Sequence, residues 1–204
     1  MQNYVYEFED SLYLNLTNRC SNDCDFCIRN IKTGVSGHKL WLIEEPSAAT
    51  VIAELDKMDL APYKEVVFCG FGEPTCALSV IEEVGPYLKS RGARTRINTN
   101  GQSNLINEIE NTAEIIAPYI DAVSVSLNAG SAEKYQEICH SEFGTEAFNA
   151  MLTFARQCAA AGINTTMSVV DCIGEEEIER CAELARQTGA HFRVRKTIKE
   201  SDRY

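Results

Sequence analysis

Segments rich in β-branched and aromatic residues alternate with segments of helical periodicity along the whole chain. The predicted strands cover residues 11–17, 65–70, 94–100, 122–128, 163–170 and 191–198. The predicted helices between them cover residues 46–58, 77–90, 105–117, 131–161 with a break near Gly144, and 175–188. Repeated strand–helix–strand units require parallel pairing and right-handed crossovers. The sequence therefore predicts an α/β fold built on six parallel strands.

One face of the predicted strands is polar. Ser124, Ser126 and Asn128 alternate with apolar residues in the fourth strand, and Arg193 and Arg195 do so in the sixth. An ordinary closed α/β barrel is lined by bulky apolar side chains. Because buried polar groups need partners, a polar concave face predicts a polar ligand. An antiparallel sheet with one wet face would show the same alternation, but it would not explain the intervening helices.

Composition limits the class of protein. The 204 residues predict one domain, 1–204, and the chain is 45% apolar and 24% charged, as in a globular protein. It contains no run of about eighteen apolar residues that would span a membrane. The acidic start carries no signal-peptide pattern, so we expect a cytoplasmic protein. A net charge of -11 disfavours a nucleic-acid partner.

Three of the nine cysteines lie close together in residues 19–30, "RCSNDCDFCIRN", directly after the first predicted strand. They are Cys20, Cys24 and Cys27. The odd number and irregular spacing of the cysteines argue against a disulfide framework. A structural zinc site would need a fourth ligand, for which His38 is a candidate. An iron–sulfur cluster would need either a distant fourth thiolate or an iron left open.

This array resembles the Cys-x3-Cys-aromatic-Cys signature of the radical S-adenosylmethionine (SAM) superfamily, with Phe26 at the aromatic position. The resemblance implies a partial (β/α)6 TIM-type barrel with a curved parallel sheet. It also implies that Cys20, Cys24 and Cys27 hold a [4Fe-4S] cluster whose remaining iron is chelated by SAM.

Further segments resemble motifs of the same family at the expected strand ends. "CGFGEPT" resembles the Gly-Gly-Glu-Pro motif, although Phe71 replaces its first glycine, and "NTNG" resembles the Thr-Asn-Gly motif. "SVSLN" resembles the fourth-strand segment that approaches the ribose or the methionine carboxylate. The resemblance, together with the polar strand face, suggests SAM contacts at Phe26, Gly70, Phe71, Gly72, Glu73, Pro74, Asn98, Asn100, Ser126, Asn128, Val169, Arg193 and Arg195. Arg193 and Arg195 are alternatively candidates for binding an anionic substrate or for salt bridges.

The remaining candidate residues have weaker signals. Cys76 and Cys172 follow strand ends and are candidates for chemistry on a substrate radical, although packing roles are expected more often. His38 lies in the long loop 28–45, which we expect to cover the cluster or contact the substrate. Cys69, Cys139, Cys158 and Cys181 are expected to be buried. At closer range, "GVSGHKLWL" and "EVVFCGFGEPT" resemble the small TatD-associated radical SAM proteins.

The activity implied by the resemblance is reductive cleavage of SAM to methionine and a 5'-deoxyadenosyl radical, which abstracts hydrogen from a substrate. The substrate is a small molecule or a peptide or protein, and the electron donor is one such as flavodoxin or ferredoxin. Closure of the open barrel by loop 28–45, by the C-terminal tail, by self-association or by a partner protein is expected. The alternatives are a non-catalytic module that binds zinc or an iron–sulfur cluster, and an electron carrier.

Overall fold

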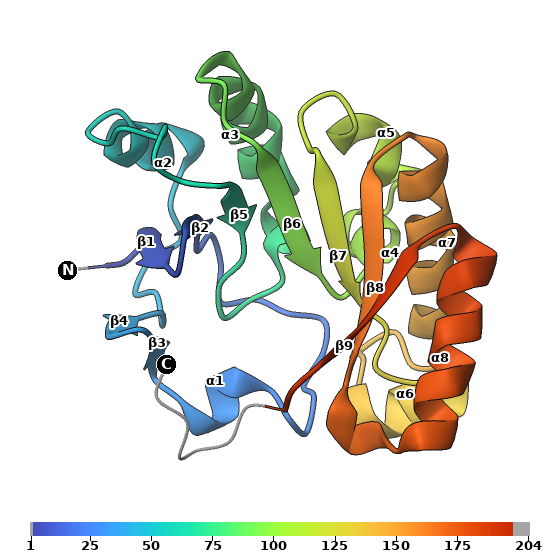
Figure 1. The fold of residues 1–204 in the computed structure, drawn as a ribbon. Helices are drawn as coiled ribbons and strands as arrows, with labels where there is room; N and C mark the ends of the chain where they lie inside the picture. Colours follow the sequence, from blue (N-terminus) through green and yellow to red (C-terminus); the bar gives the residue numbers. More distant parts are fainter. Residues whose placement is uncertain (1, 198–204) are drawn as a thin grey trace.

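A computed structural model describes residues 2–197 and contains one large, mostly parallel sheet (Figure 1). Its strands, in spatial order, are β1 (Val5–Phe8), β2 (Ser11–Leu14), β5 (Val66–Phe68), β6 (Thr95–Thr99), β7 (Ala122–Ser126), β8 (Asn164–Val170) and β9 (His191–Arg195). β1 pairs with β2 in antiparallel fashion, and every later neighbour pairs in parallel. The predicted α/β fold with a curved parallel sheet is thus confirmed.

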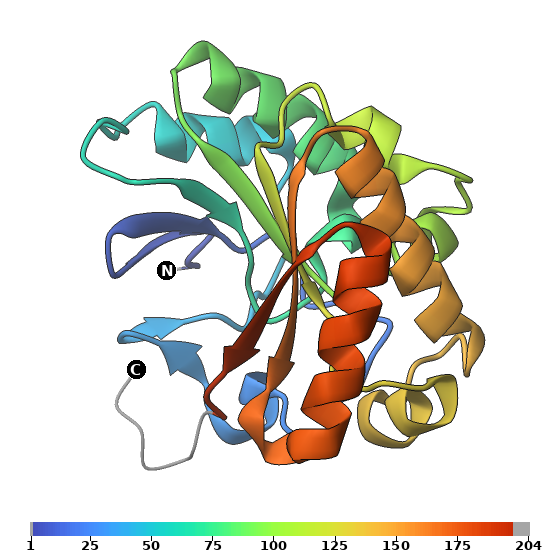
Figure 2. The same ribbon diagram turned by 45° about the vertical axis from the view of Figure 1, so that its right-hand side comes forward.

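The helices lie on the convex outer side of the sheet, as the two ribbon views show (Figures 1 and 2). They are α2 (Ala48–Leu55), α3 (Leu78–Ser90), α4 (Ser103–Asn107), α5 (Thr112–Ile116), α6 (Ala132–Cys139), α7 (Glu146–Ala160) and α8 (Glu175–Thr188). Short 3-10 turns, η1 (Pro74–Ala77) and η2 (Asp171–Ile173), follow β5 and β8. The apolar strand residues and the inner helix faces form one continuous core.

A row of paired residues shows how the sheet alternation builds this core. Leu14 pairs with Phe68, Phe68 with Ile97, and Ile97 with Val123, and all four side chains are buried in the same cluster. Successive strand side chains point to opposite faces, so the polar residues between these positions face the concave side. The helices begin at ordinary caps: the Ser131 hydroxyl, for example, accepts the Lys134 backbone N–H at 3.2 Å.

Two details differ from the sequence prediction. The helix predicted over residues 105–117 is two short helices, because Glu108 ends α4 in the left-handed conformation with φ 55°. The strand β1 was missed, and it makes the sheet seven-stranded with an antiparallel edge. Its alternation is short and lies within an acidic segment, so the pattern is weak. Residue 198 of the last predicted strand lies outside the described residues.

The segment 28–45 also contains structure that the sequence analysis treated as a loop. It includes α1 (Ile28–Ile31) and a two-stranded hairpin of β3 (Gly34–Val35) and β4 (His38–Lys39). A small apolar cluster of Tyr6, Leu40 and Phe71 joins this segment to β1 and to the loop after β5. Three of the segment's large apolar side chains remain exposed, Ile31 by 40%, Trp41 by 47% and Ile43 by 94%.

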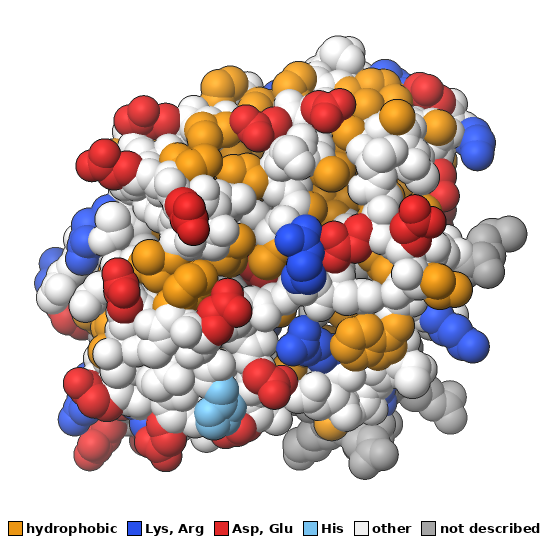
Figure 3. Space-filling view, turned by 180° about the vertical axis from the view of Figure 1, so that it is seen from behind, with side chains coloured by type: hydrophobic (Ala, Val, Ile, Leu, Met, Phe, Trp, Pro, Cys, Tyr) orange, Lys and Arg blue, Asp and Glu red, His pale blue; other side chains and the backbone are white. Residues whose placement is uncertain are grey.

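The surface is rich in acidic side chains, as the net charge of -11 predicts (Figure 3). Acidic side chains are spread over the face seen from behind in Figure 3, where the coloured side chains form no continuous basic surface. Among residues 2–197, no helix has the length and apolar character required to span a bilayer.

Candidate functional site

The candidate site lies where the parallel strands end. Because these strands run in one direction, the segments after β2, β5, β6 and β7 meet at the same edge of the sheet. Backbone hydrogen bonds join two of them directly: Gly72 N–H donates to the Thr17 carbonyl at 3.1 Å, and Glu73 N–H donates to the Arg19 carbonyl at 2.7 Å. The start of the cysteine loop is therefore fixed against the glycine segment.

The three loop cysteines are half-buried free thiols. Burial raises the pKa of Cys20 to about 12 and also raises that of Cys27. The pKa of Cys24 is raised by a hydrogen bond to the thiol of Cys139 and by burial. Such thiols are neutral at pH 7 and release protons when a metal binds.

The type and number of these donors fit an iron–sulfur cluster, in which each cysteine binds a different iron. Three thiols come from a single loop at the ligand-binding edge of the sheet, beside the glycine segment. Within the described part of the chain, no three His, Cys, Asp or Glu side chains gather closely enough to hold one metal ion.

Both glycines of the loop after β5 are required by close packing. A Cβ atom on Gly72 would lie 2.4 Å from the Thr17 carbonyl oxygen and 2.6 Å from that of Arg19. A Cβ atom on Gly70 would lie 2.0 Å from the Asn15 side-chain oxygen. Packing within the protein itself therefore explains why glycine occupies both positions. Their predicted approach to a ligand stays a prediction.

Glu73 is a buried carboxylate that binds protein donors with both oxygens. One oxygen accepts from the backbone N–H of Thr75 at 3.1 Å, its hydroxyl at 2.8 Å and the Thr99 hydroxyl at 2.7 Å. The other accepts from the Asn100 backbone N–H at 2.7 Å. Burial raises the pKa of Glu73, and these hydrogen bonds oppose that rise. The side chain thus ties the loop after β5 to the end of β6.

Asn128, at the end of β7, is buried and has a side-chain oxygen that accepts no hydrogen bond from residues 2–197. It adopts φ 59°, a left-handed conformation that asparagine tolerates better than most residues other than glycine. Its amide nitrogen donates to the Cys139 sulfur at 3.6 Å, but its side-chain oxygen has no partner. This oxygen is therefore available to a donor such as water or a bound ligand.

A buried polar network beneath the cysteine loop was missed by the sequence analysis. Its centre is Gln102, whose side-chain oxygen accepts from Ser21 at 2.8 Å and Ser141 at 2.9 Å. Its side-chain nitrogen donates to Asn22 at 2.8 Å and Tyr135 at 2.9 Å. Gln102 and Tyr135 are fully buried. The only signal in the sequence is the position of Gln102 two residues after Asn100, at a strand end.

The concave face carries the polar residues predicted there. Arg96 pairs with Glu65 at 2.8 Å and also contacts Asn98. Arg195 donates to the Ser168 hydroxyl at 3.1 Å. Burial lowers the pKa of Arg195, and the nearby charge of Arg193 lowers it further.

The other predicted residues occupy different surroundings. Val169 is fully buried in the core, and Pro74 is buried at the start of η1. Phe26 is half-buried in the cysteine loop, as is Ser126 at the end of β7. Phe71 is buried beneath Trp41, with ring centroids 5.3 Å apart.

The three candidates for chemistry on a substrate lie on different elements of the fold. Cys76 is half-buried, and burial raises its pKa to about 12, with contributions from Glu73 and Cys20. Cys172 is exposed in η2. His38 lies on β4, with its ring 5.8 Å from that of Tyr6.

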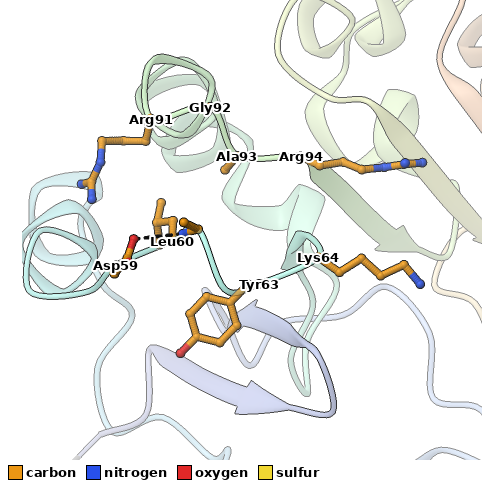
Figure 4. A pocket seen from close by; sticks show the side chains of 9 residues that line it. Asp59, Leu60, Tyr63, Lys64, Arg91, Gly92, Ala93 and Arg94 are labelled. Carbon is orange, nitrogen blue, oxygen red and sulfur yellow. Dashed lines mark hydrogen bonds between the residues drawn. The ribbon is translucent and has the colours of Figure 1, made fainter.

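A surface pocket of about 320 Å³ lies away from this edge (Figure 4). It is lined by residues 59–61, 63–64 and 91–94, which precede β5 and β6, so it opens at the amino ends of the strands. Ligands of parallel α/β folds bind at the carboxyl ends. The pocket is therefore not part of the candidate site.

The model of the radical SAM superfamily matches residues 14–187. The chain belongs to the radical SAM superfamily. Proteins of this superfamily use a [4Fe-4S] cluster and SAM, as the resemblance in the cysteine loop implies. The superfamily assignment made from the sequence is confirmed.

Individual relatives support this membership. The chain is 34% identical over 126 residues to the "Putative protein YfkA" of Bacillus subtilis, covering 60% of this chain and 30% of that protein. It is 26% identical over 190 residues to the "Putative glycyl-radical enzyme activating enzyme MJ1227" of Methanocaldococcus jannaschii, covering 91% and 67%. The chain thus spans less than a third of YfkA.

Solved structures show the same fold. Streptococcus suis SuiB bound to S-adenosylmethionine superposes with a TM-score of 0.72 at 18% identity, covering 94% of this chain and 41% of SuiB. Native anSMEcpe with bound AdoMet gives a TM-score of 0.67 at 14% identity, covering 92% and 51%. The partial TIM-type barrel of the superfamily is therefore the fold of this chain.

Proposed function

We propose that this chain is a radical SAM enzyme in which Cys20, Cys24 and Cys27 bind a [4Fe-4S] cluster. When bound, the cluster and SAM together supply a 5'-deoxyadenosyl radical, which abstracts hydrogen from a substrate. The observation that carries the proposal is the loop of three free thiols fixed by backbone hydrogen bonds to the glycine segment after β5. The superfamily match over residues 14–187 supports it.

The residues around this loop would hold SAM at the carboxyl edge of the sheet. Asn128 offers a buried oxygen without a partner, suited to a hydroxyl or ammonium donor of SAM. Arg193 and Arg195 lie on the polar face and suit a carboxylate of SAM or an anionic substrate. The other proposed contacts are Phe26, Gly70, Phe71, Gly72, Glu73, Pro74, Asn98, Asn100, Ser126 and Val169. Because the side chains of Glu73 and Val169 are buried, we propose that these two residues contact SAM through their backbone.

The protein's own task is to position these groups and to exclude water. The segment 28–45 packs against β1 and Phe71 through its apolar cluster and would cover the cluster side of the barrel. His38 in that segment, Cys76 and Cys172 are the proposed candidates for direct chemistry. A reactive radical is useful only where solvent is excluded, so we also infer closure by a second copy or a partner protein.

We infer that residues 1–204 form a single radical SAM core domain. Its substrate is a small molecule, a peptide or a protein. SuiB, with the same fold, has been seen bound to its precursor peptide SuiA, and MJ1227 is named as an activator of glycyl-radical enzymes. The electron donor is one such as flavodoxin or ferredoxin. Membership of the small TatD-associated group is proposed from "GVSGHKLWL" and "EVVFCGFGEPT" alone.

Anaerobic reconstitution tests the function. The protein should bind about four irons and four sulfides, show an EPR signal of the reduced cluster that SAM alters, and form 5'-deoxyadenosine with dithionite. Cys24→Ala should abolish all three results. Cys181→Ala, which removes a buried cysteine on α8, should retain the cluster.

The alternatives give different results in the same experiment. Stoichiometric zinc would identify a structural metal module, and a cluster whose EPR signal is indifferent to SAM would identify an electron carrier. Either result would refute the proposed enzyme.

A further inference from the structure

Cys139, the last residue of α6, lies against the middle cysteine of the loop. It is fully buried, and backbone hydrogen bonds place it beside the half-buried Cys24, 115 positions earlier in the chain. The Asn128 side chain donates to the Cys139 sulfur at 3.6 Å from the other side. Two free cysteines from distant segments are therefore neighbours.

The backbone fixes this contact on both sides of Cys24. The Asp23 N–H donates to the Cys139 carbonyl at 3.0 Å, and the Asp25 N–H donates to the Ile138 carbonyl at 3.1 Å. The Asp25 carboxylate also contacts the His140 ring at 2.8 Å. The cysteine loop is thus held on the end of α6 by several bonds, which bring Cys24 and Cys139 together from distant segments.

We propose that Cys24 and Cys139 form a reversible disulfide in the cluster-free protein, which withdraws the middle ligand of the cluster until a thiol reductant restores it. The inference rests on the proposed role of Cys24 as a ligand. With hydrogen peroxide as oxidant, the two thiols give up two hydrogens, one S–S bond forms, and the peroxide is reduced to two waters. A dithiol reverses the reaction by exchange and becomes oxidised itself.

Cys27 is the competing partner, because Cys24 and Cys27 are separated by two residues. The structure favours Cys139, because backbone hydrogen bonds on both sides of Cys24 hold it against the end of α6. Cys24 is the more exposed of the two thiols, so the oxidant reaches the pair from the side of the cysteine loop.

Peptide mapping tests the bond directly. Cluster-free protein is reduced, desalted without oxygen, treated with stoichiometric hydrogen peroxide, alkylated and digested with trypsin. Cleavage after Arg19, Arg29, Lys134 and Arg156 would leave Cys139 as the only cysteine of peptide 135–156, and the three loop cysteines in peptide 20–29. The expected product is these two peptides joined through Cys24, and dithiothreitol should separate them. A bond between Cys24 and Cys27, or Cys139 recovered in alkylated form, would overturn the proposal.

A loading experiment tests the consequence. After peroxide and its removal, the wild-type protein should take up at least fivefold less iron and sulfide in a reconstitution without thiols, and dithiothreitol should restore loading. Cys139→Ala should load equally before and after peroxide, and Cys181→Ala should behave like wild type. Equal loss in Cys139→Ala would overturn the proposal. Loading of the reduced wild-type protein is a separate result, so failure of the cluster assignment is distinguished from failure of the disulfide.

Discussion

The buried network around Gln102 provides a sharp test of how the cysteine loop is held. Replacing Gln102 with leucine keeps the approximate volume of the side chain but removes all four of its hydrogen bonds, which run at 2.8–2.9 Å to Ser21, Ser141, Asn22 and Tyr135. We expect the variant to fold with a marked loss of stability and a loosened cysteine loop.

The size of the loss follows from the partners that remain. Four hydrogen bonds at about 1 kcal/mol each would amount to about 4 kcal/mol. Tyr135 keeps a bond from Asn22 at 2.9 Å, and Ser21 keeps one from Asn100 at 2.9 Å, so part of the network survives. The side-chain oxygen of Asn22 is left buried without its donor. The expected decrease in unfolding free energy is about 3 kcal/mol.

Urea denaturation followed by circular dichroism measures this loss on the reduced, cluster-free protein. The matched control is Gln187→Leu, which removes one hydrogen bond to Glu183 on exposed helix α8 and should change stability by less than about 0.5 kcal/mol. Hydrogen exchange at residues 21–25 should also become faster in Gln102→Leu.

A decrease below about 1 kcal/mol for Gln102→Leu would refute the reasoning, since the network would then contribute little to stability. Unchanged hydrogen exchange at residues 21–25, together with a large loss of stability, would show that the network stabilises the core without holding the loop.

Two further predictions follow from local geometry. Gly72→Ala should greatly reduce iron loading, because its Cβ would lie 2.4 Å from the Thr17 carbonyl oxygen at the start of the cysteine loop. The control is Gly162→Ala, at φ 80° in open space, which should lose about 1 kcal/mol of stability and keep its iron loading. Equal iron loading of the two variants would contradict the argument. Burial alone would raise the pKa of Asp121, but hydrogen bonds from Lys89 at 2.7 Å and the backbone of Thr95 lower it. The stabilisation is therefore present above the unfolded pKa of about 4 and is lost as pH falls through the lower folded pKa. Asp121→Asn should be about 0.5–1 kcal/mol less stable than wild type at pH 7 and equally stable near pH 2. A stability difference that persists at pH 2 would be evidence against this ion pair.

The roles of single residues were not all predictable from the sequence. Glu73 is predicted at the ligand, and its carboxylate accepts hydrogen bonds from Thr75, Thr99 and Asn100. A motif shows which residue stands at a strand end, but not whether its side chain turns toward the cavity or toward the neighbouring strand. Gln102 was missed for a related reason, since a glutamine after a strand has no signal until its partners, far apart in the chain, are brought together.

The sequence by itself determined the order of strands and helices, the polar concave face and the position of the three cysteines after the first parallel strand. These features depend on local periodicity and spacing, which can be recognised from neighbouring positions in the chain. Only the tertiary structure decided the antiparallel edge strand β1, the close packing that requires Gly70 and Gly72, and the placement of Cys24 beside Cys139. Those depend on contacts between residues distant in the chain, and such contacts exist only after the strands have paired and the helices have packed on the sheet.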